Sequence, residues 1–392
     1  MSDRIAGVGG LALLRQTLSS TIVPARPLFV TRKYPPSIGG MQTLAAGVWR
    51  AMSSASSEAV LLAYGGSNRG LPRWLPFAVL RTASLLARRK IDLVLCGDAL
   101  MYAVLTPILR AFRVRHAAMV MGLDLTYGNR IYRAVVHPLL RRAPAVLAIS
   151  EATAEAAREL GIPADRVSVV RLGVQTPDAS PDRRTARRLV GELIGVGEDA
   201  VVLLTLGRLV RRKGARWFVG EVMPRLPAKV VYVLAGDGDE LEPVQRAAVR
   251  AGTADRVYLL GQVDDEEREV LMRGADLFVQ PNIRVPGDME GFGLVTVEAA
   301  MRGVPVVAAA LEGILDAVVD GQTGVLLSPG DADVWVTQLG AMVADRPSLE
   351  AAGARAASEC RARYSEDGMR AAFVDLLRLP QPGRSWPVTD PT

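Results

Sequence analysis

The sequence predicts an α/β protein built from two doubly wound, Rossmann-like domains. Short apolar runs alternate with longer Ala-, Leu- and Arg-rich stretches of helical spacing, which is typical of parallel sheets covered by helices. The runs are almost wholly apolar, as expected of strands buried on both faces of a sheet. A length of 392 residues with 49% hydrophobic residues suffices for two cores. In this fold class we expect the ligand site at the carboxyl ends of the strands, in a cleft across which the domains face each other.

The expected strands fall into two series separated by a polar break. The first series comprises residues 27–31, 59–64, 92–96, 117–121, 145–149 and 167–171. The second comprises residues 201–206, 230–236, 256–261, 276–281 and 305–309. Residues 174–199, between the two series, have the Pro, Asp, Ser and Arg content of a linker followed by a surface helix.

We therefore expect an N-terminal domain over residues 1–175 and a C-terminal domain over residues 176–365. Residues 1–25 are interpreted as an extension rather than a signal peptide, because their apolar part is short, carries Asp3 and precedes no clear cleavage site. The last segment, 366–392, ends in a Pro-rich tail from Leu379 onward.

Composition limits the chemistry. Cys96 and Cys360 are too few for a disulfide framework or a cysteine zinc site, and they favour a reduced, cytoplasmic protein. His116 and His137 are the only histidines, so a multi-histidine metal centre is excluded. We interpret His116 as an ordinary residue at a strand start and His137 as an ordinary helix residue. No uncharged stretch reaches the roughly 18–20 residues of a membrane span.

The net charge of +6 favours an anionic partner: nucleic acid, an anionic membrane surface or a phosphorylated substrate. The arginines are spread widely, and neither an RNP-type aromatic strand motif nor a zinc finger occurs. We therefore expect no nucleic-acid partner.

The segment from Pro281 to Ala309 is the most informative. Glu290 lies in a Gly-rich loop after an expected strand, and Gly291, Phe292 and Gly293 let the backbone approach a ligand closely. A helix is expected to begin near Leu294, and its N-terminus suits a phosphate. Glu298 lies about one turn into that helix, and carboxylates accept hydrogen bonds from sugar hydroxyls. Isolated glutamates are usually structural or solvated, but this strand–loop–helix context favours a ligand site.

Two further loops follow expected strands. Arg208 and Lys213 lie in LGRLVRRKG, where an Arg fork and a Lys point charge can neutralise a diphosphate. We expect Arg208 and Lys213 to be exposed in the open cleft, and we expect Arg211 and Arg212 to be solvent-facing neighbours. Gly39 and Gly40 lie between a Pro-rich loop and an expected helix, where backbone N–H groups can approach an anion; an ordinary turn is the alternative.

Over about residues 27–375, the chain resembles the family 4 glycosyltransferases of the GT-B fold. Three elements carry the resemblance: the E-x7-E pattern of Glu290 and Glu298, the G-R-L-x-x-x-K-G element of residues 207–214, and the P-P-x-x-G-G loop of residues 35–40. The runs VLAISEATAEAARELGI, LAGDGDELEPV and LLGQV also occur in the expected order. The resemblance implies retaining transfer of a hexose-type sugar from a UDP- or GDP-linked donor to a hydroxyl acceptor, without a cofactor or a metal. It also implies that the final helix, from Arg370, crosses back onto the N-terminal domain.

The resemblance assigns a role to each matching residue. The donor diphosphate would be held by Arg208 and Lys213, and Glu290 would bind the donor sugar, which makes these three the candidate catalytic residues. The remaining donor contacts would come from the Phe292–Leu294 backbone, Glu298 at the ribose, Gly40 beside Gly39 at the phosphates and Val263 at the base. Asp124 would orient donor or acceptor.

One departure keeps other functions open. Many relatives carry a histidine near the reacting sugar where this chain has Met121, and neither of its histidines replaces it. A GT-B fold used only as a binding or assembly subunit is therefore an alternative, as is another GT-B enzyme such as a nucleotide-sugar epimerase or a phosphorylase. GVGGLA at residues 7–12 matches a dinucleotide fingerprint, but no strand precedes it.

The acceptor side has two interpretations. Residues 71–90 are basic and apolar and include Trp74. They form either a pair of helices packed on the N-terminal sheet or a contact with an anionic membrane, as a lipid-linked acceptor would require. The second interpretation places the protein at the inner membrane surface. The acceptor would be a glycan, a glycolipid or a small-molecule glycoside.

Overall fold

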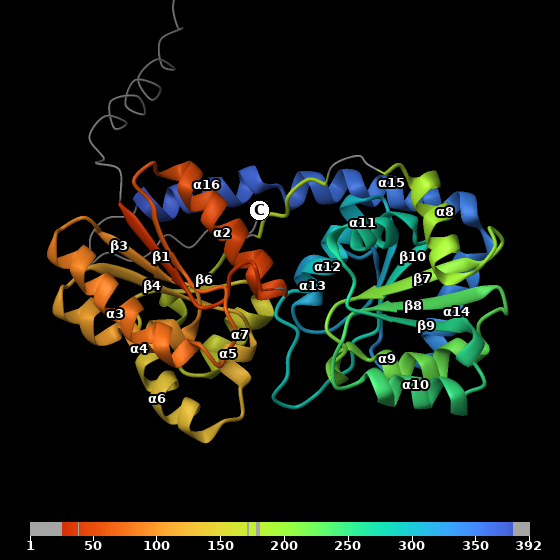
Figure 1. Cartoon of the computed structure of the whole chain (residues 1–392), viewed down its shortest axis with the longest axis horizontal. Helices are drawn as coiled ribbons and strands as arrows, with labels where there is room; N and C mark the ends of the chain where they lie inside the picture. The colour runs from red at the N-terminus through yellow and green to blue at the C-terminus, as the bar shows by residue number, and fades with distance from the viewer. Residues whose placement is uncertain (1–25, 38, 171, 178–180, 379–392) are drawn as a thin grey trace, which may run out of the picture.

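A computed structural model describes residues 26–378, except residues 38, 171 and 178–180. The expected extension 1–25 and the Pro-rich tail lie outside the described residues. The chain forms two parallel six-stranded sheets, each covered by helices, which lie at the two ends of an elongated molecule (Figure 1). The predicted α/β architecture with two doubly wound units is confirmed.

The first sheet has the strand order β2-β1-β3-β4-β5-β6. Its strands are β1 Pro27–Thr31, β2 Val60–Ala63, β3 Leu93–Cys96, β4 Arg115–Val120, β5 Val146–Ala148 and β6 Val167–Val169. The order reverses between β1 and β3, so the chain leaves these two neighbouring strands in opposite directions. Such a switch point opens a crevice at the carboxyl ends of the strands.

The second sheet has the order β12-β11-β10-β7-β8-β9, with its switch point between β7 and β10. Its strands are β7 Val201–Leu206, β8 Val230–Ala235, β9 Val257–Gly261, β10 Leu277–Gln280, β11 Val306–Ala309 and β12 Val325–Leu327. The edge strand β12 was not predicted, because its three residues are too short a run to stand out from a turn.

The helices alternate with the strands. Those between strands of the first sheet are α2 Gly40–Ala55, α3 Leu71–Ala87, α4 Ala99–Ala111, α5 Leu123–Thr126, α6 Arg130–Leu140 and α7 Glu151–Glu159. Those before or between strands of the second are α8 Arg183–Ile194, α9 Ala215–Trp217, α10 Leu241–Arg250, α11 Asp265–Gly274, α12 Leu294–Met301 and α13 Ile314–Ala317. The last three are α14 Ala332–Ala344, α15 Arg346–Arg363 and α16 Glu366–Arg378. Segment 71–90 contains one helix, α3, where a pair was expected.

Helix α16 crosses from the second sheet back to the first and lies beside α2 (Figure 1). Arg50 Nε in α2 donates to Glu366 Oε1 at 2.8 Å. Gly173 packs under the start of α16 so closely that a Cβ there would lie 2.7 Å from the carbonyl oxygen of Ser365. The expected crossover of the final helix is therefore confirmed.

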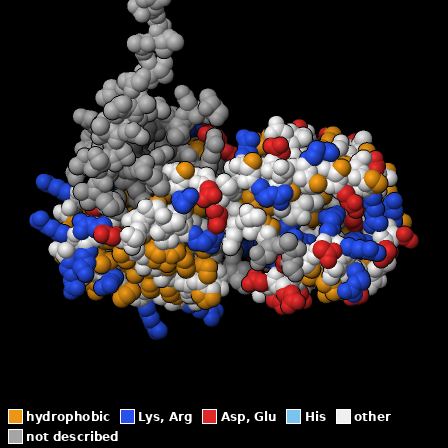
Figure 2. All heavy atoms as spheres, turned by 90° about the horizontal axis from the view of Figure 1, so that it is seen from above, with side chains coloured by type: hydrophobic (Ala, Val, Ile, Leu, Met, Phe, Trp, Pro, Cys, Tyr) orange, Lys and Arg blue, Asp and Glu red, His pale blue; other side chains and the backbone are white. Residues whose placement is uncertain are grey.

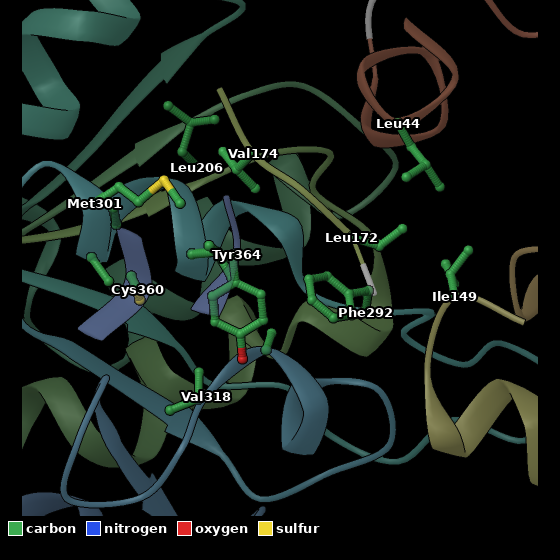
Figure 3. Close-up of a cluster of buried hydrophobic side chains, with 14 of the residues drawn as sticks. Leu44, Ile149, Leu172, Val174, Leu206, Phe292, Met301, Val318, Cys360 and Tyr364 are labelled. Atoms are coloured by element: carbon green, nitrogen blue, oxygen red, sulfur yellow. The ribbon is translucent and has the colours of Figure 1, made fainter. Parts of the chain in front are cut away.

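A continuous apolar cluster joins the two halves of the molecule. It includes Phe29 in β1. From Leu44 in α2 it runs through Leu172 to Phe292 and Tyr364 (Figure 3). Segments at the carboxyl ends of strands also touch across the boundary. Glu151 N donates to Asp316 Oδ1 at 2.9 Å. The two sheets thus turn their ligand-binding edges toward one another.

Candidate active site

Two loops meet at the switch point of the second sheet. Residues 207–214 follow β7 and residues 281–293 follow β10, and they are joined by a hydrogen bond from Ile283 N to the Arg212 carbonyl at 2.9 Å. Gly214, at φ +69°, packs against the second loop, and a Cβ there would lie 1.8 Å from the Pro281 carbonyl oxygen. Only glycine allows this contact, which brings the basic loop to the glutamate loop.

The centre of the site is a buried ion pair. Lys213 Nζ lies 2.7 Å from Glu290 Oε2, and the two residues are only 7% and 8% exposed. Asn282 Nδ2 donates to the same carboxylate at 3.1 Å. Burial alone would raise the pKa of Glu290, but the charges of Lys213 and Arg212 outweigh it and lower the pKa to about 2. Glu290 is therefore a carboxylate that accepts hydrogen bonds at neutral pH.

The burial of this pair corrects two expectations. Lys213 was expected to be exposed and is buried. Arg212 was expected to face solvent, but its Nη1 donates to Asp288 Oδ1 at 3.0 Å and its Nε lies 3.4 Å from Glu290 Oε2. Residues 211–213 form a 3₁₀ turn, in which successive side chains point about 120° apart. Arg211 is exposed, as expected.

Arg208 differs from its basic neighbours. It directly follows β7 and Gly207 and is exposed, and its side chain forms no hydrogen bond or ion pair with the part of the chain that the structure describes. This guanidinium is free to bind an anionic ligand at the switch point.

Glu298 has a cationic partner of its own. It lies in α12, which begins at Leu294 as predicted, directly after Gly293 at φ +85°. Arg268 Nη2, from α11, donates to the buried Glu298 Oε2 at 2.6 Å. Each carboxylate of the E-x7-E pattern therefore has a separate cationic partner, as two separate ligand contacts would require.

Two residues that hold Glu290 in place were not predicted from the sequence. Asn282 follows the end of β10 and holds Glu290; its place after a strand was the available signal. Glu312 accepts a hydrogen bond from Glu290 N at 2.6 Å, and Gly313 N donates to the Glu290 carbonyl at 3.1 Å. Glu312 lies 22 residues further along the chain, and nothing in its local sequence indicates this contact.

The other predicted donor contacts, Phe292, Gly39, Gly40 and Val263, lie in different parts of the structure. The side chain of Phe292 packs on Tyr364, with ring centroids 6.0 Å apart, so only its backbone is available to a ligand (Figure 3). Gly39 precedes α2 and Gly40 begins it, as expected. Val263 is half-buried between β9 and α11.

The first sheet contributes a buried charge cluster. Asp98, which is fully buried, accepts from Arg32 Nε at 3.1 Å and caps α4 by accepting from Met101 N. Asp124 is buried and accepts from the N–H of Met121 at 3.2 Å. Burial, together with the nearby Asp98 charge, raises the pKa of Asp124 to about 7.

This charge cluster lies close to the glutamate loop of the second sheet. A Cβ on Gly122, next to Met121, would lie 3.2 Å from the Cα of Gly291.

Among the described residues, no group of three or more His, Cys, Asp or Glu side chains could hold a metal ion. His116 lies in β4 and bonds the Val114 carbonyl, and His137 is buried in α6. Both histidines occupy the ordinary positions expected for them.

Family models match both halves of the chain. A model described as "Glycosyl transferases group 1" matches residues 194–359, and one described as "Glycosyltransferase Family 4" matches residues 51–177. The chain belongs to glycosyltransferase family 4. Its two sheets and facing edges are those of the GT-B fold.

Relatives of this family 4 glycosyltransferase include two kinds of enzyme. The chain is 29% identical to a GDP-mannose-dependent α-(1-6)-phosphatidylinositol monomannoside mannosyltransferase of Mycolicibacterium smegmatis, over 83% of this chain and 91% of the relative. It is 35% identical to a D-inositol 3-phosphate glycosyltransferase of Xylanimonas cellulosilytica, over 58% of this chain and 56% of the relative.

Solved structures share the fold at low sequence identity. The Anabaena protein HepE, in complex with UDP and glucose, is 20% identical and has a TM-score of 0.74, covering 90% of this chain and 99% of HepE. A sucrose-phosphate synthase from Thermosynechococcus elongatus is also 20% identical, with a TM-score of 0.73 over 90% of this chain and 98% of the synthase.

Proposed function

We propose that the protein is a retaining glycosyltransferase that moves a hexose from a nucleoside diphosphate to a hydroxyl on a lipid-linked or inositol-type acceptor. The observation that carries this proposal is the meeting of Arg208, Lys213 and Glu290 at the switch point of the second sheet. Because the mycobacterial relatives are GDP-mannose-dependent mannosyltransferases, GDP-mannose is the first donor to test.

The charges support an assignment of roles. In the proposed transfer, the bond from the anomeric carbon to the phosphate oxygen breaks, and a bond to the acceptor oxygen forms as the acceptor hydroxyl gives its proton to the departing diphosphate. Negative charge develops on the departing diphosphate, where Arg208 and the ammonium of Lys213 can stabilise it. Glu290 is ionised at neutral pH and can accept hydrogen bonds from the sugar hydroxyls.

Retention and metal independence are parts of the same proposal. Retention rests on membership of the family. Metal independence rests on the cations of residues 208–213, which offer the charge that a divalent ion offers elsewhere.

We further propose that helices α3 and α6 contact an anionic membrane that carries the acceptor. No described helix is long and apolar enough to span a bilayer. However, Phe77 and Leu80 in α3 are 55% and 70% exposed, and Ile131 and Val135 in α6 are 77% and 55% exposed. Figure 2 shows apolar side chains gathered on one face of the N-terminal half, bordered by Lys and Arg. Exposed apolar groups among cations favour an anionic lipid surface.

Vesicle binding tests the membrane contact. The protein should sediment with vesicles containing phosphatidylinositol but not with pure phosphatidylcholine vesicles. The double variant Phe77→Ser/Leu80→Ser should lose this binding, whereas Val249→Ser, at a 66% exposed position in α10, should retain it. Equal binding by both variants would exclude α3 as the contact.

Donor turnover tests the central function. The protein is incubated with GDP-mannose, UDP-glucose or UDP-galactose and phosphatidylinositol-type acceptors, and release of the nucleoside diphosphate is measured. We expect turnover with one donor, unaffected by EDTA, and a product of retained configuration by NMR. Loss of turnover in EDTA that magnesium restores would contradict metal independence, and an inverted product would contradict retention. Nucleotide binding without turnover would favour the binding-subunit alternative that Met121 raises.

A further inference from the structure

A groove on the outer face of α6 takes no part in the site described above. Figure 1 shows α6 at the lower edge of the N-terminal half, where it packs on α4. The groove has a volume of about 330 Å³, and it is lined by Arg130, Arg133, Ala134, His137, Pro138 and Arg141. These positions recur at intervals of three or four residues, so they share one face of the helix. The short side chain of Ala134 leaves a hollow between its longer neighbours.

The cations of this groove have no acidic partner. No Asp or Glu occurs over residues 125–150 of the sequence. Within the described residues, the side chains of Arg130 and Arg133 form no hydrogen bond or ion pair. Arg141 Nε donates to the neutral carbonyl of Leu160 at 2.6 Å. Like charges three or four residues apart destabilise a helix unless an anion lies among them, so the groove is suited to an anionic ligand.

His137 adds an unused hydrogen-bonding atom to the groove. Its position is that of an ordinary helix residue, but it is only 5% exposed, and its Nε2 is buried without a hydrogen-bond partner among the described residues. A buried polar atom without a partner is costly, and a ligand that bonds it removes that cost. Burial and the charges of Arg133 and Arg141 lower the pKa of His137, so the ring is neutral at pH 7. A neutral imidazole offers one donor and one acceptor to the oxygens of a ligand.

The two halves of the chain differ in charge. Residues 26–175 contain 20 Lys and Arg against eight Asp and Glu, whereas residues 176–392 contain 25 Lys and Arg against 32 Asp and Glu. The excess positive charge of the protein is therefore concentrated in the half that contains α6. A surface of this sign is attracted to anionic lipids.

An apolar stripe lies beside the groove on the same helix. Ile131 and Val135 are 77% and 55% exposed. Each follows a groove residue by one position, Arg130 or Ala134, and is therefore turned from it by about 100° around the helix axis. An exposed apolar stripe next to a basic groove suits a phosphate that is joined to acyl chains, because a soluble phosphate gives the apolar side chains nothing to contact.

We propose that the groove of α6 binds the phosphate-bearing headgroup of an anionic phospholipid. The inference deepens the membrane contact proposed above and rests on it. The arginines of the groove surround the headgroup phosphate, His137 Nε2 bonds a headgroup oxygen, and Ile131 and Val135 enter the acyl region. Binding then depends on the headgroup as well as on charge. Because α6 follows α5, which carries Asp124, a bound lipid places this side of the site next to the bilayer.

Flotation of the full-length protein with phosphatidylinositol vesicles tests the groove. Arg130→Gln/Arg133→Gln should weaken vesicle binding by about tenfold or more, because two cations next to the headgroup are lost. The matched control is Arg110→Gln/Arg113→Gln, which removes the same charge from exposed, unpaired positions of the same half outside the groove. The control should change binding by less than about threefold, since charges far from the lipid are screened. Equal losses in the two double variants would show a general attraction and overturn the proposal.

Substitution of His137 separates a shaped groove from a charged surface. His137→Phe keeps a ring and removes the hydrogen-bonding atom without removing a charge at pH 7. It should weaken vesicle binding by about threefold or more, whereas His137→Gln, which keeps a polar group, should retain most of the binding. The melting temperature of each variant checks that the fold is kept. Unchanged binding by a folded His137→Phe would refute the groove, and if this variant does not fold, the arginine variants decide.

A soluble ligand identifies the source of the phosphate. We expect free inositol phosphate to compete poorly with vesicles, and Ile131→Ser/Val135→Ser to lose vesicle binding. If that variant binds vesicles normally and free inositol phosphate displaces them, the lipid assignment is wrong. If the arginine and histidine variants all bind vesicles as the wild type does, the groove is refuted while a membrane contact through α3 stands. If the wild type binds no anionic vesicle, the membrane contact and the groove both fail, whereas the donor turnover test still decides the proposed transfer.

Discussion

The buried pair of Lys213 and Glu290 should stabilise the fold as well as bind the donor. Glu290→Gln preserves the shape of the side chain but leaves the Lys213 ammonium buried without a carboxylate at 2.7 Å. The pKa of Glu290 falls from an ordinary 4.5 to about 2, and at about 1.4 kcal/mol for each pKa unit this corresponds to about 3 kcal/mol. Removing one partner of a buried ion pair costs about 3–5 kcal/mol, which agrees. We therefore expect Glu290→Gln to lose about 3 kcal/mol of unfolding free energy at pH 7.

Urea unfolding of a double-mutant cycle measures this coupling. Glu290→Gln and Lys213→Met should each destabilise, and the double variant should lose clearly less than the sum. Arg211→Gln, at the exposed neighbour, should stay within about 0.5 kcal/mol of the wild type. If the two single losses simply add, or if Glu290→Gln matches Arg211→Gln, the pair does not hold the loops together and the reasoning is refuted.

Acid titration gives the same test a second readout. Because the folded pKa of Glu290 is depressed, its contribution is present above pH about 4.5 and is lost as pH falls toward about 2. The stability difference between the wild type and Glu290→Gln should therefore shrink across that window. A difference that stays constant down to pH 2 would assign the loss to some other interaction.

Three further predictions concern the rest of the site. Arg208→Gln should lower kcat/KM at least tenfold with an unchanged melting temperature, since the side chain is exposed and unpaired; a drop in melting temperature would contradict its assignment as a free ligand-binding group. Glu298→Gln should weaken binding of the bare nucleoside diphosphate by about 1–3 kcal/mol in calorimetry, whereas Glu290→Gln should mainly slow transfer; equal effects would argue against separate ribose and sugar contacts. Asp124→Asn should become more stable relative to the wild type as pH rises from about 4 to about 7. The raised pKa of Asp124 means that ionising its carboxyl lowers the unfolding free energy of the wild type over that range, whereas the amide does not ionise. Parallel curves of stability against pH would show that Asp124 is not protonated.

The sequence predicted the position of the site better than its internal contacts. Parallel strands end at one edge of a sheet, so loops after β7 and β10 had to meet if those strands were neighbours. The burial of Lys213 could not be predicted, because Arg211, Arg212 and Lys213 are alike in composition and only the 3₁₀ turn separates their directions. The contact of Glu312 with Glu290 depends on tertiary packing, which no local pattern records.

The return of α16 to the first half has a consequence for recombination between relatives. The stretch that packs as the N-terminal half is not contiguous in the gene, because it needs residues 366–378 as well as the residues up to about 175. The two matching family models stop at residues 177 and 359 and so leave α16 out. A chimaera cut once in the linker would seat one parent's α2 against the other parent's α16, breaking matched contacts such as Arg50 with Glu366. Exchange of N-terminal halves between such enzymes should therefore use two cut points, one on each side of the C-terminal half.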